Sequence, residues 1–173
     1  MKKERRDMKK GITRREREVT DINEILGILD RAKIVHVGMI DAGRPYVVPM
    51  NYGYTMENGK LTLYLHGAKE GRKLDVLRAD PNVFIEIDTD VVPFEGITAC
   101  HYGVGYSSII GEGVAELVED AEGKKQALSI LMKTQTGRDF TFDDRMASVV
   151  TCIKLHVSEF TAKKRPLPMP SNI

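Results

Sequence analysis

The chain has 173 residues, a formal net charge of +1, 42% hydrophobic residues and 29% charged residues. This length favours one domain, and the balance is typical of a soluble globular protein. No apolar run approaches the roughly 18 residues of a membrane span, and no apolar segment follows the basic start as in a secretory signal. Cys100 and Cys152 lack the spacing of a metal site or disulfide framework. We therefore expect a cytoplasmic protein with no membrane partner and no bound metal.

Positive charge is concentrated at the start of the chain. Residues 1–17 contain nine Lys/Arg and three Asp/Glu, a net of +6, which leaves −5 for the remainder. No basic patch interleaved with aromatic residues follows, so a solvated or subunit-packing arm is favoured over a nucleic-acid contact. The predicted organisation is a basic arm over 1–17, one domain over 18–162 and a C-terminal tail over 163–173.

The first half of the domain is predicted to be a helix followed by an antiparallel meander. Asp21 can cap a helix whose apolar stripe is Ile22, Ile25, Leu26 and Leu29. Three strands are expected in "KIVHVGMI", "PYVVPMNYGYT" and "LTLYLH". The pair Asn58-Gly59 before the third strand suits a tight hairpin, because both residues tolerate positive φ.

The second half adds two helices and three more strands. A helix of about ten residues is expected from Lys69, ended by Pro81. "NVFIEID" reads as a strand, 89–105 as a loop, and "SSIIGEGVAELV" as a long strand bulged at its glycines. "DAEGKKQALSILMK" is a capped amphipathic helix, and "SVVTCIKLHVSEF" is the last strand. This order favours an antiparallel barrel with helices outside it over a doubly wound parallel sheet.

The stretch "LYLHGAKEGRKLDVLRADPNV" contains a candidate site for a phosphorylated ligand. His66 ends a strand, and Gly67 and Ala68 leave room for close approach to the backbone. Unpaired N–H groups at the start of the next helix favour an anion, and Arg72 and Lys73 add cationic donors. A solvated helix start explains the pattern equally well. The stretch is neither a P-loop nor a G-x-G-x-x-G fingerprint.

The stretch "PYVVPMNYGY" is the second informative segment. Because proline cannot donate to a ladder, Pro49 indicates an edge or a bulged strand. Its free main-chain groups could pair with the polar rim of a flat heterocycle, or the proline could protect the edge against aggregation. His36 in an apolar strand is interpreted as a satisfied core or face histidine, and Glu86 and Asp88 as a solvated strand face.

Together these segments resemble a known family. "REREVTD", "PYVVPMNYGY", "LYLHGAKEGRKLDVLRADPNV", "YSSIIGEGVAELVED", "KKQALSILM" and "CIKLHVSEFTAKK" are similar to the FMN-binding split-barrel superfamily related to pyridoxamine 5′-phosphate oxidase. Within it, they resemble the nitroimidazole-resistance (Nim-type) reductases. The resemblance covers nearly the whole chain after the basic arm.

The resemblance implies a mainly β fold with α: a six-stranded antiparallel split β-barrel with peripheral helices. It implies a homodimer with FMN at the subunit interface. His66 would lie beside the flavin as the candidate catalytic residue. The implied cofactor-binding residues are Val48, Pro49, Met50, Asn51, Tyr52, His66, Gly67, Ala68, Lys69, Gly71, Arg72, Lys73, Tyr106, Ser107 and Ser108. The last three would approach the flavin from the long strand, either of the same subunit or of the other subunit.

The implied function is an FMN-binding oxidoreductase that reduces a small electron-poor compound, with NAD(P)H as a possible donor. The end "KKRPLPMPSNI" lacks the Arg/Trp-containing substrate region of the oxidase, so pyridoxamine phosphate is not the expected substrate. One alternative is a non-catalytic flavin or haem carrier of the same fold. Another is a nucleic-acid adaptor that uses the basic arm.

Overall fold

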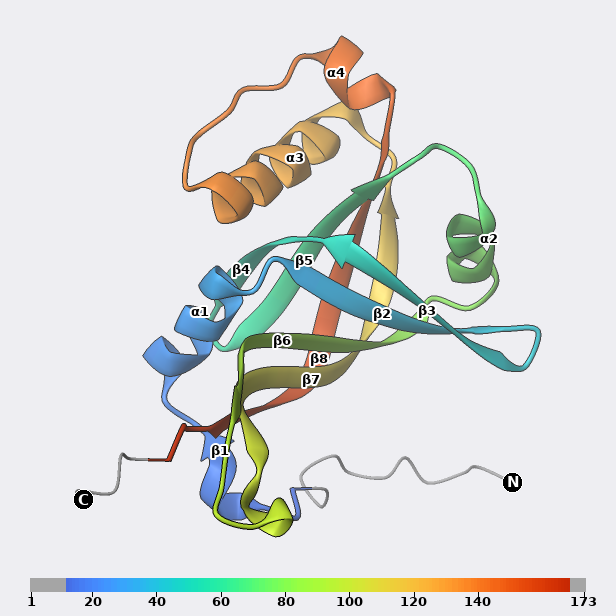
Figure 1. The fold of residues 1–173 in the computed structure, drawn as a ribbon. Helices are drawn as coiled ribbons and strands as arrows, with labels where there is room; N and C mark the ends of the chain where they lie inside the picture. Colours follow the sequence, from blue (N-terminus) through green and yellow to red (C-terminus); the bar gives the residue numbers. More distant parts are fainter. Residues whose placement is uncertain (1–11, 169–173) are drawn as a thin grey trace.

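The computed structural model describes residues 12–168, so most of the basic arm and the last five residues lie outside the described part. Within residues 12–168 the chain forms one antiparallel sheet of eight strands that curves into a barrel (Figure 1). The strands are β1 (Glu18–Val19), β2 (Ile34–Asp41), β3 (Arg44–Asn51), β4 (Gly53–Glu57), β5 (Lys60–Gly67), β6 (Asn82–Phe94), β7 (Gly103–Val118) and β8 (Thr151–Arg165). The helices are α1 (Ile22–Arg31), α2 (Arg72–Ala79), α3 (Ala121–Thr136) and α4 (Asp144–Ser148), with short 3-10 turns at Arg15–Arg17 and Ala99–His101.

The predicted fold class is confirmed, with two strands more than the six expected. The expected strand "PYVVPMNYGYT" is divided at Tyr52 into β3 and β4, and the two-residue β1 adds to β8. The sheet order is β3-β2-β6-β7-β8-β5-β4, so β3 and β4 form its two edges although they adjoin in sequence. The barrel is therefore closed by a chain kink at Tyr52 rather than by a ladder of hydrogen bonds.

Several local predictions agree with the structure. The Asp21 carboxylate accepts hydrogen bonds from the N–H groups of Asn23 and Glu24 at the start of α1. Asn58 and Gly59 both have positive φ in the β4–β5 turn. Pro49 pairs with His36 on β2, and its other side faces no strand, as an edge position requires.

Two glycines allow the long strand to close against β8. The β7–β8 register shifts between Glu112 and Gly113, leaving Ser158 as the extra residue of a bulge. A Cβ at Gly113 would lie 2.4 Å from the carbonyl oxygen of His156, and one at Gly111 would lie 2.8 Å from that of Glu159. Only glycine fits such an approach, so the predicted bulge is confirmed with its cause.

Residues 89–105 are strands at both ends rather than the expected loop. β6 continues to Phe94 and β7 begins at Gly103, so most of the segment forms a two-stranded hairpin beyond the body of the barrel (Figure 1). Pro93 pairs only with Val104 at this position, where no third strand needs its missing N–H. We call residues 89–105 the β6–β7 arm.

Two helix and strand ends also differ from the expectation. α2 begins at Arg72 rather than Lys69, because Gly71 has φ +135 and cannot continue a helix backwards. β8 runs to Arg165, so Lys163 and Lys164 at the start of the predicted tail pair with Ser108 and Ser107.

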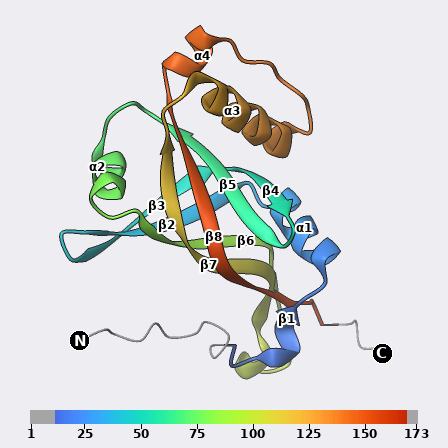
Figure 2. The same ribbon diagram turned by 180° about the vertical axis from the view of Figure 1, so that it is seen from behind.

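The core fills the barrel and is closed at one end by α3 and α4 (Figure 2). Tyr52 is fully buried, and its hydroxyl donates to the Leu29 carbonyl oxygen at 2.7 Å. Next to it, a Cβ at Gly53 would lie 2.4 Å from the Cα of Leu131, so α3 packs directly on the kink between β3 and β4. Among the described residues, no helix is long and apolar enough to cross a membrane.

Candidate cofactor site

The turn between β5 and α2 forms an exposed glycine-bearing corner, residues 66–73, which we call the β5–α2 corner. Gly71 occupies the N-cap position of α2 and has no side chain to cap it, so the first N–H groups of the helix receive no side-chain hydrogen bond. An added Cβ at Gly71 would meet nothing within 4 Å. The corner thus combines open space with uncapped backbone donors, as binding of an anion requires.

Cationic side chains surround this corner. Lys73 lies across Gly67, since a Cβ there would be 2.9 Å from its Cε and Nζ atoms. Arg72 donates from Nε to Asp41 Oδ2 at 2.7 Å, and its guanidinium lies 4.2 Å from the ring centroid of Tyr46. These two contacts orient Arg72 and connect the corner to the β2–β3 hairpin. Its Nη groups make no hydrogen bond with any residue in 12–168, so they can still receive a ligand oxygen.

The corner contains further predicted residues. His66 is exposed at the end of β5, opposite Cys152 of β8. Ala68 and Lys69 are exposed in the turn. Within residues 12–168, neither the His66 ring nor the Lys69 ammonium takes part in a hydrogen bond or an ion pair. The structure therefore brings all seven predicted residues of the stretch "HGAKEGRK" into one exposed turn.

The predicted residues of β3 and its end divide into two groups. Pro49 and Asn51 are exposed on the edge strand, while Met50 is buried and Val48 packs partly against the core. Tyr52 takes part in the core: its hydroxyl donates to the carbonyl oxygen of Leu29, and its own carbonyl oxygen accepts from Gln135 at 2.7 Å. Burial raises the pKa of the Tyr52 hydroxyl. A role of Tyr52 near a cofactor would be to hold β3 in place.

The third predicted group, on β7, takes part in a separate polar cluster. Ser107 is buried, and its hydroxyl donates to Asp90 Oδ2 at 2.9 Å. Arg31 holds the same carboxylate with Nε–Oδ1 and Nη2–Oδ2 distances of 3.0 and 2.8 Å. The hydrogen bond from Arg31 lowers the pKa of Asp90. We call Arg31, Asp90 and Ser107 the Asp90 cluster; Tyr106 and Ser108 lie on the opposite, outward face of β7.

One chain does not bring the β7 residues to the corner. His66 pairs with Cys152 of β8, which in turn pairs with Val118 at the end of β7. Ser107 precedes Val118 by eleven residues on the same strand, about 35 Å along an extended chain. The predicted site residues therefore form two separate halves in a single copy.

The outer face of the sheet contains a cluster that sequence reasoning treated as separate residues. Register places His36 opposite Glu86, and His36 Nδ1 lies 2.9 Å from Glu86 Oε2. One ligand atom each of His36, Glu86 and Asp88 lies within 4.8 Å of the others. The prediction that His36 is a satisfied histidine is confirmed. Its partner Glu86 is 50 residues away in sequence and lies next to it because of the pairing register of β2 and β6.

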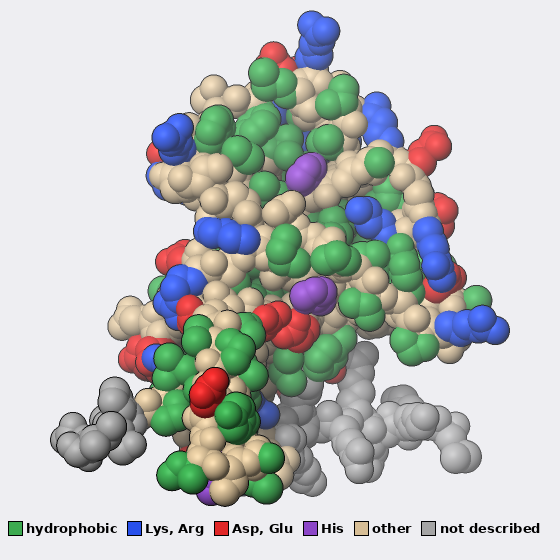
Figure 3. All heavy atoms as spheres, in the orientation of Figure 1, with side chains coloured by type: hydrophobic (Ala, Val, Ile, Leu, Met, Phe, Trp, Pro, Cys, Tyr) green, Lys and Arg blue, Asp and Glu red, His purple; other side chains and the backbone are tan. Residues whose placement is uncertain are grey.

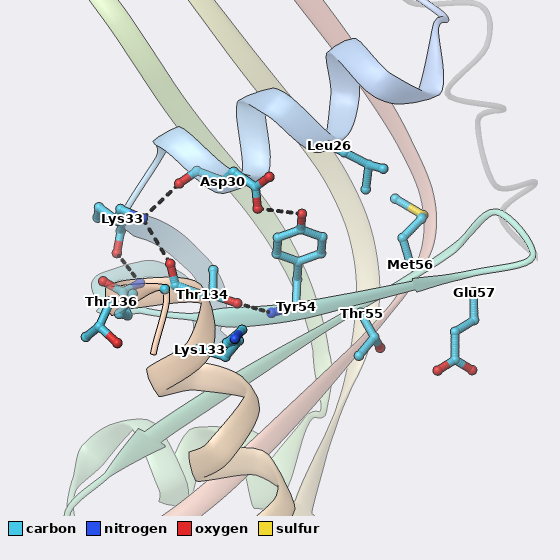
Figure 4. Close-up of a pocket in the computed structure, with 12 residues that line it drawn as sticks. Leu26, Asp30, Lys33, Tyr54, Thr55, Met56, Glu57, Lys133, Thr134 and Thr136 are labelled. Atoms are coloured by element: carbon cyan, nitrogen blue, oxygen red, sulfur yellow. Dashed lines mark hydrogen bonds between the residues drawn. The ribbon is translucent and has the colours of Figure 1, made fainter. Parts of the chain in front are cut away.

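A cavity of about 820 Å³ lies elsewhere, between α1, β4 and the C-terminal end of α3 (Figure 4). Several of its polar groups are bonded to one another: Tyr54 donates to Asp30 Oδ1 at 2.7 Å, and Lys33 Nζ donates to the carbonyl oxygens of Asp30 and Thr134. None of the predicted cofactor residues lines it. We interpret it as a junction where Lys33 satisfies carbonyl groups at two helix ends.

Known proteins with a similar sequence or structure have the same fold as this chain. The family model described as pyridoxamine 5′-phosphate oxidase matches residues 21–164. A crystal structure from Bacteroides thetaiotaomicron, described as a candidate 5-nitroimidazole antibiotic resistance protein, is 35% identical, with a TM-score of 0.72 over 85% of this chain and 86% of that chain. A search of curated proteins found no match.

Two more distant structures share the fold. The flavocytochrome Anf3 from Azotobacter vinelandii is 20% identical, with a TM-score of 0.75 over 94% of this chain and 76% of that chain. An FAD and heme binding protein from Mycobacterium smegmatis is 15% identical, with a TM-score of 0.73 over 90% and 77%. From the family match over most of its length, this chain belongs to the pyridoxamine 5′-phosphate oxidase family.

Proposed function

We propose that this protein is an FMN-dependent oxidoreductase that reduces a small electron-poor compound, such as a nitroimidazole, with NAD(P)H as the electron donor. The observation that carries the proposal is the β5–α2 corner, where uncapped helix N–H groups and exposed cations lie beside an edge strand. The 35% identical structure described in terms of 5-nitroimidazole resistance supports the choice of substrate class.

The residues present fit a phosphorylated flavin. The N–H groups at the start of α2, with Arg72, Lys73 and Lys69, offer donors for a phosphate dianion. The kink at Tyr52 leaves the outer edge of β3 without a neighbouring strand, so Val48 to Asn51 can offer main-chain groups to the polar rim of the ring. When bound, the flavin supplies the electron transfer, and the protein binds and orients it.

The proposed site requires a second copy of the chain. Tyr106 and Ser108 face outward from β7, about 35 Å along the strand from the corner of their own chain. In a homodimer they can reach the flavin held by the partner, and they then complete the half-site that one chain leaves open.

His66 is the proposed proton donor to the reduced substrate. Its imidazole is exposed next to the proposed phosphate corner, and it makes no hydrogen bond or ion pair within residues 12–168 that would fix its charge. Histidine is the side chain that enzymes use most often as a general acid, so His66 is suited to give a proton to the substrate.

The test begins with the cofactor. Protein purified from a host grown with riboflavin is denatured, and the released chromophore is identified as FMN, FAD or haem by chromatography. FMN at about one per chain, followed by NADH or NADPH oxidation that depends on a nitroimidazole, is the expected result. Haem, or flavin without turnover of any nitro compound or quinone, would instead establish the carrier alternative.

A pair of histidine variants then tests the proton donor. His66→Ala is expected to keep its flavin and lose turnover, while His156→Ala keeps both. His156 serves as the control, because it is also exposed and lies on the neighbouring strand β8, where it is 2.7 Å from Glu116. Full turnover of the His66 variant with full flavin content would remove His66 from the mechanism.

A further inference from the structure

Two residues of the β2–β3 hairpin contact Arg72, the first residue of α2. Asp41 Oδ2 accepts from Arg72 Nε at 2.7 Å, and the Tyr46 ring centroid lies 4.2 Å from the guanidinium. We call Asp41, Tyr46 and Arg72 the Arg72 cluster. In Figure 3, Lys and Arg side chains lie along the side of the molecule that α2 and the hairpin form, with Asp and Glu side chains between them. The cluster joins two elements that are distant in sequence, since Asp41 and Arg72 are 31 residues apart.

Asp41 pairs with Arg72 although another arginine lies closer in sequence. The register of β2 and β3 places Arg44 directly opposite Asp41, yet within residues 12–168 Arg44 makes no ion pair. The Asp41 side chain is 31% exposed, half the value of the Arg72 side chain. The short acceptor is therefore the more buried partner, and it restricts the longer arginine side chain.

A tight turn fixes the position of Asp41. Ala42 and Gly43 follow it with φ of 47 and 80, so both residues of the two-residue hairpin turn are left-handed. This conformation is uncommon for alanine and persists only where the surrounding structure holds it. Here β2 pairs with β3 without interruption from Ile34 to Asp41. Asp41 thus belongs to a continuous ladder rather than to a loose loop.

Tyr46 supports one face of the guanidinium. Its ring packs partly against the core, so the ring is itself held in place. A guanidinium is a planar fork of five N–H donors, and in Arg72 the Nε donor is taken by Asp41. The edge that carries the two Nη groups remains, and this edge can bind two oxygens of one phosphate group.

The open backbone donors of α2 belong to Arg72 and the next residue. Leu74 and Asp75 donate their N–H groups to the carbonyl oxygen of Gly71 at 2.9 and 3.3 Å. Within residues 12–168 the N–H groups of Arg72 and Lys73 donate to no acceptor. A phosphate group at this helix start can therefore receive donors from the backbone and from the side chain of Arg72 together.

We propose that Asp41 and Tyr46 are positioning residues for the phosphate group of FMN, because they hold Arg72 in one orientation before the ligand binds. This inference rests on the proposed function. An unrestrained arginine loses rotamer freedom when it binds, whereas an arginine that is already held loses less. Asp41 also brings a negative charge close to the phosphate. Its orientation of Arg72 and its charge therefore have opposite effects on FMN affinity.

These opposite effects allow a direct test. Asp41→Ala removes both the charge and the acceptor for Arg72 Nε, while Asp41→Asn removes the charge and keeps an oxygen that can accept. Dissociation constants of flavin-free protein for FMN and for riboflavin, which lacks the phosphate group, are measured by quenching of flavin fluorescence. We expect Asp41→Ala to raise the constant for FMN about fivefold and Asp41→Asn to leave it within about twofold. The constant for riboflavin should not change in either variant.

Each other outcome has a definite meaning. Unchanged or tighter FMN binding by Asp41→Ala would show that Asp41 does not position Arg72, and it would leave the proposed function standing. Equal weakening of FMN and riboflavin would show a merely structural role and would also overturn the inference. If the unchanged protein bound neither flavin, the proposed function would fail and this inference with it.

Asp75→Ala is the matched control for charge. Asp75 is a carboxylate in the first turn of the same helix, and it pairs with Arg78 rather than with Arg72. Its removal takes away a negative charge near the corner without releasing Arg72, so it should not raise the dissociation constant for FMN. A rise equal to that of Asp41→Ala would contradict a specific role of Asp41.

The role of Tyr46 is tested with two further variants. Tyr46→Phe keeps the ring below the guanidinium and should leave FMN affinity unchanged. Tyr46→Leu removes the ring and should raise the dissociation constant for FMN about threefold, with riboflavin unaffected. Equal FMN affinities of the two variants would show that the ring face does not hold Arg72.

Discussion

Two polar regions at opposite ends of β7 use their charges differently. In the Asp90 cluster the carboxylate accepts from both the guanidinium of Arg31 and the hydroxyl of Ser107. In the β5–α2 corner Arg72 bonds to Asp41 through Nε alone, and His66, Lys69 and Lys73 form no side-chain bonds with the described residues. Groups that bond to one another stabilise the fold, whereas donors held toward solvent around an uncapped helix start remain available to a ligand.

This contrast separates stability from binding among residues that the sequence placed in one site. Ser107 and Tyr52 were predicted beside Arg72 and Lys73 as cofactor residues, but the structure bonds their hydroxyl groups to Asp90 and Leu29. We therefore expect substitutions at the first pair to change the free energy of unfolding and substitutions at the second pair to change the affinity for FMN.

The largest expected effect is that of Arg72→Ala on FMN binding. Hydrogen bonds to charged groups contribute about 1.5–3 kcal/mol, so the dissociation constant should rise roughly 10- to 100-fold, measured by quenching of flavin fluorescence. The free energy of unfolding should change little, because the Arg72 side chain is 62% exposed and its ion pair with Asp41 is a surface pair.

Arg78→Ala is the matched control for this prediction. Arg78 lies in the last turn of the same helix, is similarly exposed and also has an ion pair, to Asp75. It should leave FMN affinity unchanged. If both variants weakened FMN equally, the corner would act only through its general positive charge and not as a specific phosphate site.

Tyr52→Phe should show the opposite pattern. Removal of the hydroxyl leaves the Leu29 carbonyl oxygen without this donor in the core, which costs about 1–2 kcal/mol of unfolding free energy. FMN affinity should remain within twofold of the unchanged protein, since the Tyr52 ring is fully buried. Urea denaturation and flavin titration on the same preparation provide both values, and a large loss of FMN affinity at unchanged stability would contradict the structure.

The sequence predicted what depends on short stretches of chain. The Asp21 cap, the Asn58-Gly59 turn and the edge position of Pro49 follow from backbone rules that act over a few residues. The turn from His66 to Lys73 was found for the same reason, because glycine, cations and helix start adjoin in sequence.

Contacts between distant segments escaped prediction. Arg31 and Asp90 are 59 residues apart, and His36 meets Glu86 only because β2 and β6 adopt one register. The β6–β7 arm is predicted to be a loop because proline and glycine usually interrupt strands. The structure differs because a two-stranded hairpin tolerates both residues. The Tyr52 side chain points into the core because of the kink that closes the barrel, and no local sequence pattern predicts that kink.

The smallest expected effect is that of Asp90→Asn, and its pH dependence tests the Asp90 cluster. Asparagine keeps the side-chain shape and tolerates the left-handed backbone at this position, where φ is 58. It removes the charge that Arg31 contacts. Because the Asp90 side chain is 38% exposed and its interaction is screened by solvent, we expect a loss of about 1 kcal/mol at pH 7.

The sign of the pH dependence follows from the lowered pKa of Asp90, caused first by its hydrogen bond from Arg31. The folded protein holds this carboxylate ionised at a lower pH than the unfolded chain does. The stabilisation is therefore fully present above the unfolded pKa, about 3.9, and is lost as pH falls through the lower folded value. Urea denaturation should show a constant gap between the two proteins from pH 7 to 5, and the gap should close below pH 4. A gap that persisted in acid would mean that Asp90 acts through its shape alone, and the contrast between a self-bonded cluster and an open cationic corner would then not rest on charge.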